Sequence, residues 1–147
     1  SGSTPPWTAV ATVKARFDSV GLMGHSAGAR LLASAARDAS GSGYNVTAAV
    51  LSHGGTHDPN SDALTMPAFF MDAQYDEHVH PETMYAVFDR VYPLDPTNGH
   101  VFVNLAKGNH SEPHDLGQLN DWTSRFLGCH VKGRPTSCGR IYGTQSD

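Results

Sequence analysis

The sequence predicts an α/β fold, with a mostly parallel sheet of about four strands and flanking helices. Two observations carry this prediction. Short apolar runs of strand length alternate along the chain with longer segments of helical periodicity or helix-forming composition. One apolar run, Pro67–Met71 (PAFFM), is apolar on both faces. Such strands are typical of a parallel sheet that helices cover on both sides.

The first half of the chain supplies two strands and the helix between them. Val20–Met23 is a brief apolar run, and Val46–Ser52 (VTAAVLS) is a second one. Ala27–Asp38 is rich in the helix formers Ala, Leu and Arg, and its small residues allow close packing on a sheet. Ser40–Gly43 (SGSG) ends this helix. Trp7–Arg16 predicts a further short helical segment.

The second half supplies the remaining strands and two amphipathic helices. After Pro67–Met71, the segment Pro81–Tyr92 has proline in its first turn, which favours a helix start. His100–Leu105 predicts the fourth strand, and Leu116–Leu127 predicts the last helix. The apolar positions with helical spacing are Met84, Val87, Phe88 and Val91 in the first of these helices, and Leu119, Trp122, Thr123 and Phe126 in the second.

Size and charge narrow the classes of function. The 147 residues are long enough for one domain, which we expect to span residues 1–147. A net charge of −4 and ten scattered basic residues argue against a nucleic-acid partner. No apolar stretch approaches the ~20 residues of a membrane span, so the sequence predicts none.

The two cysteines predict a pinned C-terminal tail. Cys129 and Cys138 are separated by a segment that contains Gly133 and Pro135, and a bridge between them would close a short loop. We expect this disulfide to hold the tail, residues 129–147, after the last helix. A disulfide requires an oxidising compartment, so the protein is expected to be secreted or extracellular. Free thiols in a cytosolic protein are the alternative.

The pentapeptide Gly24–Gly28 (GHSAG) lies between a predicted buried strand and a helix of small residues. In that position a sharp turn lifts the Ser26 hydroxyl above the sheet and strains the serine backbone. Gly24 and Gly28 would keep the close approach of strand and helix open. Ser26 is therefore predicted to be a nucleophile, with an ordinary structural turn as the alternative.

A serine nucleophile needs a base, and the base needs an orienting carboxylate. Both should follow later strands, at the same edge of the parallel sheet as Ser26. Asp76 follows PAFFM by a few residues and is favoured as the acid over Asp72, which is nearer the strand and could be a buried structural acid or an N-cap. His110 follows the fourth strand and is favoured as the base over His114.

Neighbouring positions complete the predicted site. The N–H of Ala27 starts the helix after the turn and is expected to form half of an oxyanion hole. His25, inside the turn, and His53, in the loop SHGGTH after the second strand, are expected to contact substrate. His53 with His57, and His78 with His80, have the composition of metal ligands. They occupy polar loops, however, and we expect neither a metal nor an organic cofactor.

Three segments resemble the α/β-hydrolase superfamily, in its secreted esterase and lipase branch of dienelactone-hydrolase-like, cutinase-like and polyester-hydrolase-like enzymes. They are GLMGHSAGA around Ser26, PAFFMDAQYDEHVHP around Asp76 and KGNHSEP around His110. The likeness covers most of residues 17–128. It implies ester hydrolysis through an acyl-enzyme, without metal or organic cofactor, on a small-molecule or polymeric ester.

The chain also departs from this family. Its members are about twice as long, with about four strands before the nucleophile strand, and a loop among those strands supplies the second oxyanion N–H. The sheet is therefore expected to be the C-terminal half of an α/β-hydrolase sheet, with the Ser26 strand at an open edge. A separate N-terminal half chain, a fragment, or a homo-oligomer that covers the edge would each account for this.

The sequence thus predicts a serine hydrolase of carboxylic esters with Ser26, His110 and Asp76 as its catalytic residues. A non-catalytic hydrolase-like binding module, or half of a split hydrolase, is the alternative from another class. A thioesterase, acyltransferase or peptidase would use the same three residues, and the sequence does not separate these activities from an esterase.

Overall fold

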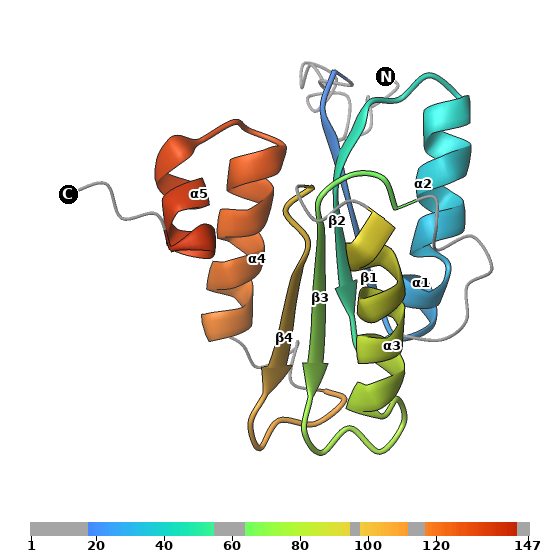
Figure 1. The fold of residues 1–147 in the computed structure, drawn as a ribbon, viewed down its shortest axis with the longest axis vertical. Coiled ribbons are helices and arrows are strands. Elements are labelled where there is room, and N and C mark those ends of the chain that lie inside the picture. Colours follow the sequence, from blue (N-terminus) through green and yellow to red (C-terminus); the bar gives the residue numbers. More distant parts are fainter. Residues whose placement is uncertain (1–17, 55–63, 95–97, 112–116, 144–147) are drawn as a thin grey trace, which may run out of the picture.

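The structure is a computed structural model, which describes residues 18–54, 64–94, 98–111 and 117–143. Four parallel strands form one sheet, and helices cover both of its faces (Figure 1). The elements in chain order are β1 (Val20–His25), α1 (Ala27–Arg30), α2 (Leu32–Gly41), β2 (Val46–Ser52), β3 (Ala68–Ala73), α3 (Pro81–Val91), the 3-10 turn η3 (Tyr92–Leu94), β4 (Val101–Leu105), α4 (Gly117–His130) and α5 (Pro135–Tyr142). The predicted α/β fold is confirmed. The segment Trp7–Arg16 lies outside the described residues.

The strands lie in the order β1-β2-β3-β4, and each neighbouring pair is parallel. The carboxyl ends of all four strands therefore meet at one edge of the sheet, the lower edge in Figure 1. The loops that follow β1, β2, β3 and β4 all leave from this edge. The topology thus brings four segments that are distant in sequence to one place.

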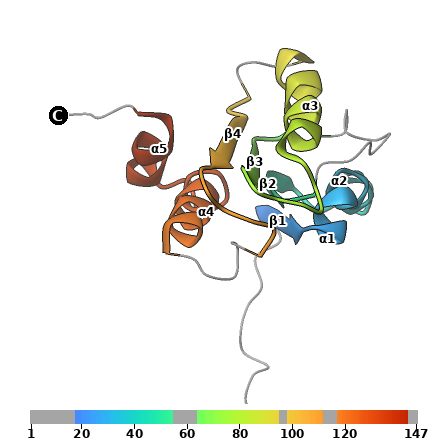
Figure 2. The same cartoon turned by 90° about the horizontal axis from the view of Figure 1, so that it is seen from below.

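Two hydrophobic cores lie on the two faces of the sheet, and alternate residues of β2 and β3 enter each of them. Helices α1, α2 and α3 pack on one face, and α4 and α5 lie on the other (Figure 2). The first core receives Ala49, Leu51 and Phe70 from the strands, and the second receives Ala48, Val50, Phe69 and Met71. Every residue of β3 is buried, as the sequence predicted for PAFFM.

The predicted helix over Ala27–Asp38 forms two helices, α1 and α2, which meet at Leu31. The Leu31 side chain is 66% exposed, so no core contact holds it in either helix. None of the helices in the described part of the chain is long and apolar enough to cross a bilayer.

Helix α5 was not predicted from the sequence. It is only eight residues long and has no buried residue, although Ile141 is partly buried against the second core. Two other contacts hold it: the Cys129–Cys138 disulfide joins it to α4, and the Tyr142 hydroxyl donates a hydrogen bond to the Gly99 carbonyl at 2.6 Å. The expected disulfide is therefore present in the structure. It is compatible with an extracellular location, and secretion stays a prediction.

Strand β1 lies at an edge of the sheet formed by the described residues, where β2 is its neighbour. Its residues are all intermediate or exposed, and Met23 is 54% exposed. The expected edge position of the Ser26 strand is therefore confirmed for this part of the chain. The pairing of β1 with a separate half chain or a second copy stays a prediction.

Candidate active site

Ser26 stands on the sharp turn between β1 and α1. Its backbone has φ 52° and ψ −120°, a left-handed φ that non-glycine residues rarely adopt. The Ser26 N–H donates to the carbonyl of Ser52 at the end of β2 (2.9 Å), and the Ser26 carbonyl accepts from the N–H groups of Ala29 and Arg30. The turn is thus bonded on both sides. These bonds hold a backbone conformation that costs on the order of 1–3 kcal/mol.

Glycines allow the elements around this turn to approach closely, although not all at the predicted positions. A Cβ on Gly24 would lie 2.6 Å from the Gly28 carbonyl carbon and oxygen, so the prediction for Gly24 is confirmed. A Cβ on Gly28 would meet nothing within 4 Å, so the prediction for Gly28 is wrong. Gly54, after β2, has the role instead, because a Cβ there would collide with the Ala29 Cβ and would lie 2.5 Å from the Ser26 carbonyl oxygen.

The structure brings Ser26, His110 and Asp76 into one hydrogen-bonded chain. His110 Nε2 lies 3.0 Å from Ser26 Oγ, and His110 Nδ1 lies 2.8 Å from Asp76 Oδ2. Ser26 follows β1, Asp76 follows β3 and His110 follows β4. The three residues therefore meet for the reason on which their prediction rested, since parallel strands end at one edge of the sheet.

Asp76 is buried and strongly hydrogen-bonded. Its exposed fraction is 2%, and its Oδ1 accepts the backbone N–H groups of His78 and Val79, each at 2.8 Å. Burial by itself would raise the pKa of Asp76, but the Val79 N–H, the His110 ring and the His78 N–H together hold the pKa below its usual value. An ionised Asp76 accepts the Nδ1–H of His110, which leaves Nε2 free to accept the Ser26 hydroxyl proton.

His25 has a contact that sequence reasoning missed. Its Nε2–H donates to the backbone carbonyl of His110 at 3.0 Å, and the two rings lie 4.9 Å apart between centroids. The bond ties the end of β1 to the loop that carries His110. The His78 ring also packs against the His110 ring, at 4.9 Å between centroids. No pattern in the sequence indicates this bond between His25 and the His110 carbonyl. The expected contact of His25 with substrate stays a prediction.

His53 lies beneath this group of side chains and has no exposed surface. Its backbone φ of 51° is left-handed, and its Nδ1 lies 2.8 Å from Ser52 Oγ. Its ring centroid is 5.8 Å from that of His110. The expected contact of His53 with substrate finds no support here, because a side chain with no exposed surface cannot touch a bound molecule without a rearrangement.

The other candidate residues are placed as follows. Ala27 is the first residue of α1, where a backbone N–H has no acceptor within the helix, and its oxyanion role stays a prediction. Asp72 is fully buried in β3, in keeping with its alternative reading as a buried structural acid. His57 and His114 lie outside the described residues.

One group of metal-ligand types occurs in the described ranges: His53, Asp72 and Asp76, with one donor atom of each within 4.8 Å of the others. Both oxygens of Asp76 already accept hydrogen bonds, from His78, Val79 and His110. A cation would compete with these donors, including His110, for the charge of Asp76. We therefore assign no metal to this group.

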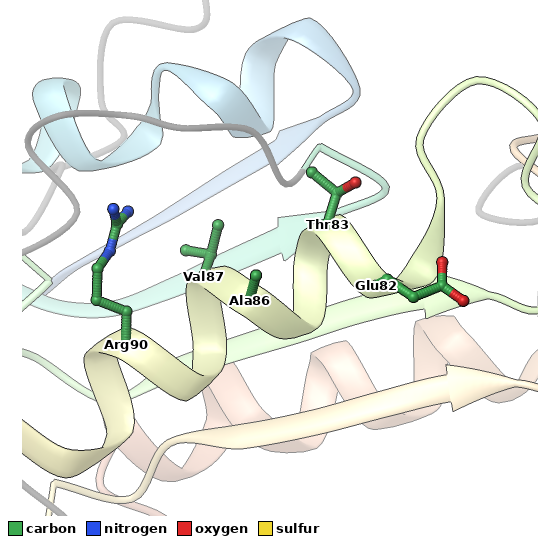
Figure 3. Close-up of a pocket in the computed structure, with 5 residues that line it drawn as sticks. All are labelled: Glu82, Thr83, Ala86, Val87 and Arg90. Atoms are coloured by element: carbon green, nitrogen blue, oxygen red, sulfur yellow. The ribbon is translucent and has the colours of Figure 1, made fainter.

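A cavity of about 330 Å³ lies elsewhere, beside α3 (Figure 3). Its lining residues are Glu82, Thr83, Ala86, Val87 and Arg90. It includes neither Ser26 nor His110. We therefore identify the candidate active site from the hydrogen bonds among its side chains at the sheet edge, and not from a cavity.

Comparison of the chain with protein-family models finds no match, and comparison with curated proteins finds none either. The fold and the arrangement of the side chains therefore carry the functional argument.

Two buried groups in the site, His53 and Asp72, change the free energy of unfolding with pH in opposite directions. Burial lowers the pKa of His53 from 6.5 to about 4, and burial also raises the pKa of Asp72 from 3.8 to about 7. Between about pH 4 and 6.5, the folded protein therefore holds a proton on Asp72, whereas the unfolded chain holds one on His53. In the wild type, the contributions of His53 and Asp72 to the slope of the unfolding free energy against pH therefore offset each other.

Replacing His53 by glutamine is expected to expose the Asp72 contribution. Relative to wild type, the free energy of unfolding should then fall with rising pH by up to about 1.4 kcal/mol per unit between pH 4 and 6.5, because the folded variant binds more protons than the unfolded one. Asp72→Asn should give the opposite sign over the same range. Urea titrations at several pH values measure both slopes, and curves parallel to wild type would contradict the expectation.

Proposed function

We propose that this protein is a serine hydrolase that cleaves carboxylic esters through an acyl-enzyme. One observation carries the proposal: Ser26, His110 and Asp76 form a continuous hydrogen-bonded chain at the carboxyl edge of a parallel sheet, with Ser26 on a strained turn. This arrangement supports a place in the α/β-hydrolase superfamily, which the sequence resembles at the same three segments.

In the proposed reaction, Ser26 Oγ attacks the ester carbonyl carbon while its proton moves to His110 Nε2. The new bond makes a tetrahedral intermediate, and the Ala27 N–H donates to its oxyanion. The intermediate collapses as the bond to the alkoxy oxygen breaks, and His110 gives the proton to the leaving alcohol. Asp76 stabilises the imidazolium ion and keeps the Nδ1–H of His110 directed toward itself.

A water molecule then releases the acyl group. The water oxygen attacks the acyl carbon while His110 takes a proton from the water. His110 then returns a proton to Ser26 Oγ as the ester bond to the enzyme breaks. The products are the carboxylic acid and the free enzyme. His25 supports both halves of the reaction, because its bond to the His110 carbonyl restrains the loop from which the imidazole projects.

A fluorophosphonate probe tests the proposal, because such probes react with an activated serine and not with ordinary serine hydroxyls. We expect the folded protein to gain one probe adduct, found by mass spectrometry on the peptide that contains Ser26. Ser26→Ala and the urea-denatured wild type should gain none. A folded wild-type protein that stays unlabelled would contradict the proposal and would favour a non-catalytic binding module.

A further inference from the structure

Asp72 brings a second buried carboxyl group to the proposed triad. It lies in β3 with no exposed surface, and its Oδ1 accepts the N–H of Ala73 at 2.8 Å. Its Oδ2 is buried and has no hydrogen-bond donor among the residues that the structure describes. A carboxyl oxygen of Asp76 lies within 4.8 Å of one on Asp72. The Asp72 carboxyl therefore lies beside Asp76 with one oxygen unpaired.

Two ionised carboxylates this close together, both withdrawn from water, would repel each other strongly. Asp76 is the one suited to ionisation, because it accepts hydrogen bonds from His110, His78 and Val79. Asp72 accepts one, from the neighbouring N–H in its own strand. The difference in hydrogen bonding therefore assigns the negative charge to Asp76 and the proton to Asp72.

We propose that Asp72 is a neutral carboxylic acid whose Oδ2–H donates a hydrogen bond to the Asp76 carboxylate, making Asp72 a positioning residue for the triad. The bond gives the unpaired oxygen a partner and adds a restraint on Asp76 to those from His110, His78 and Val79. It also draws negative charge from the Asp76 oxygens, which lessens their pull on a proton at His110. The positioning role rests on the proposed hydrolysis, whereas the protonation state of Asp72 does not.

The surroundings of Asp72 favour this neutral form. Burial raises the pKa of Asp72 to about 7, and the charge of Asp76 adds to the shift. The other titratable groups that converge here are His53 from the end of β2 and His110 from the loop after β4. His53 is itself neutral near pH 6, because burial lowers its pKa to about 4. It therefore supplies no positive charge that would ionise Asp72.

Carbon-13 NMR of the wild-type protein tests the protonation state directly. With aspartate labelled at the side-chain carboxyl carbon, the Asp72 signal at pH 6 should have the chemical shift of a protonated acid, and the Asp76 signal that of a carboxylate. Asp72→Asn and Asp76→Asn identify the two signals by their loss. Two carboxylate-type signals at pH 6 would overturn the proposal, whether or not the protein hydrolyses esters.

Two variants test the positioning role. Asparagine can still accept the Ala73 N–H and donate an amide N–H to Asp76, so below about pH 7, where wild-type Asp72 keeps its proton, Asp72→Asn should keep the wild-type pH–rate profile and the wild-type titration of the His110 ring signals. Asp72→Ala removes the donor, so both midpoints should rise by about half a pH unit or more. A shift of these Asp72→Asn curves to lower pH that is already present below pH 6 would mean that a charge had been removed from a site proposed to be neutral there, and would overturn the proposal. If Asp72→Ala does not fold, that result in Asp72→Asn still decides it.

Discussion

Replacing Ser26 by alanine is expected to lower kcat/KM for a short p-nitrophenyl ester by at least about 10⁴-fold. The variant keeps the His110–Asp76 bond but has no oxygen that can form the acyl-enzyme, so covalent catalysis is lost entirely. The remaining rate would come from oriented donors alone. Hydrolysis followed at 405 nm, with the buffer rate subtracted, measures the difference.

Ser42→Ala is the matched control, because Ser42 is an exposed serine at the C-terminal end of α2, near the amino end of β2 and so away from the sheet edge that carries Ser26. It should hydrolyse the ester at the wild-type rate. Both variants should also keep the wild-type circular dichroism spectrum, since neither side chain belongs to a core. If Ser26→Ala kept more than about a tenth of the wild-type rate, Ser26 would not be the nucleophile.

Replacing Gly24, at the turn before Ser26, is expected to have a large effect on both stability and ester turnover. Gly24→Ala places a Cβ 2.6 Å from the carbonyl carbon and oxygen of Gly28 and 2.7 Å from the Ala29 nitrogen. These are backbone atoms, so the strand and the helix must separate, at an expected cost of about 1–3 kcal/mol in the free energy of unfolding. The same movement displaces Ser26 from His110, and ester turnover should fall at least about tenfold.

Gly28→Ala is the contrasting variant, because its Cβ meets nothing within 4 Å and its backbone is not left-handed. Its position in α1 favours alanine over glycine, so the free energy of unfolding should stay the same or rise by up to about 1 kcal/mol. Thermal and urea denaturation of the two variants compare them directly. Equal destabilisation by both substitutions would contradict the packing at the turn.

The main elements and the three proposed catalytic residues could be predicted because their signals are local. Strand Val46–Ser52 was predicted with its observed bounds, and Pro81–Tyr92 ends within one residue of α3. Ser26, Asp76 and His110 each lie in the segment that follows a strand, and parallel pairing then requires that these segments share an edge. The apolar stripe from Leu119 to Phe126 could be predicted for the same reason, because the helical spacing of its residues is visible in the sequence.

Other features depend on neighbours that are distant in sequence. Gly54 must lack a side chain because α1 crosses over it, whereas Gly28, inside the motif, faces open space. Helix α5 is held by a disulfide, by the Tyr142–Gly99 bond and by the contact of Ile141 with the second core, and all three have partners outside the helix. A local pattern contains no information on such contacts.

The sequence by itself determined the parallel α/β architecture, the turn at Ser26, and the strand ends from which Asp76 and His110 project. The spacing of apolar residues and the positions of glycines indicate these features directly, because each feature depends on only a few neighbouring residues. Only the tertiary structure decided that His53 is buried, that His25 restrains the His110 loop, and that the Asp72 carboxyl lies beside Asp76. The physical reason is that burial and charge proximity, which set protonation, arise only when separate strands are packed side by side.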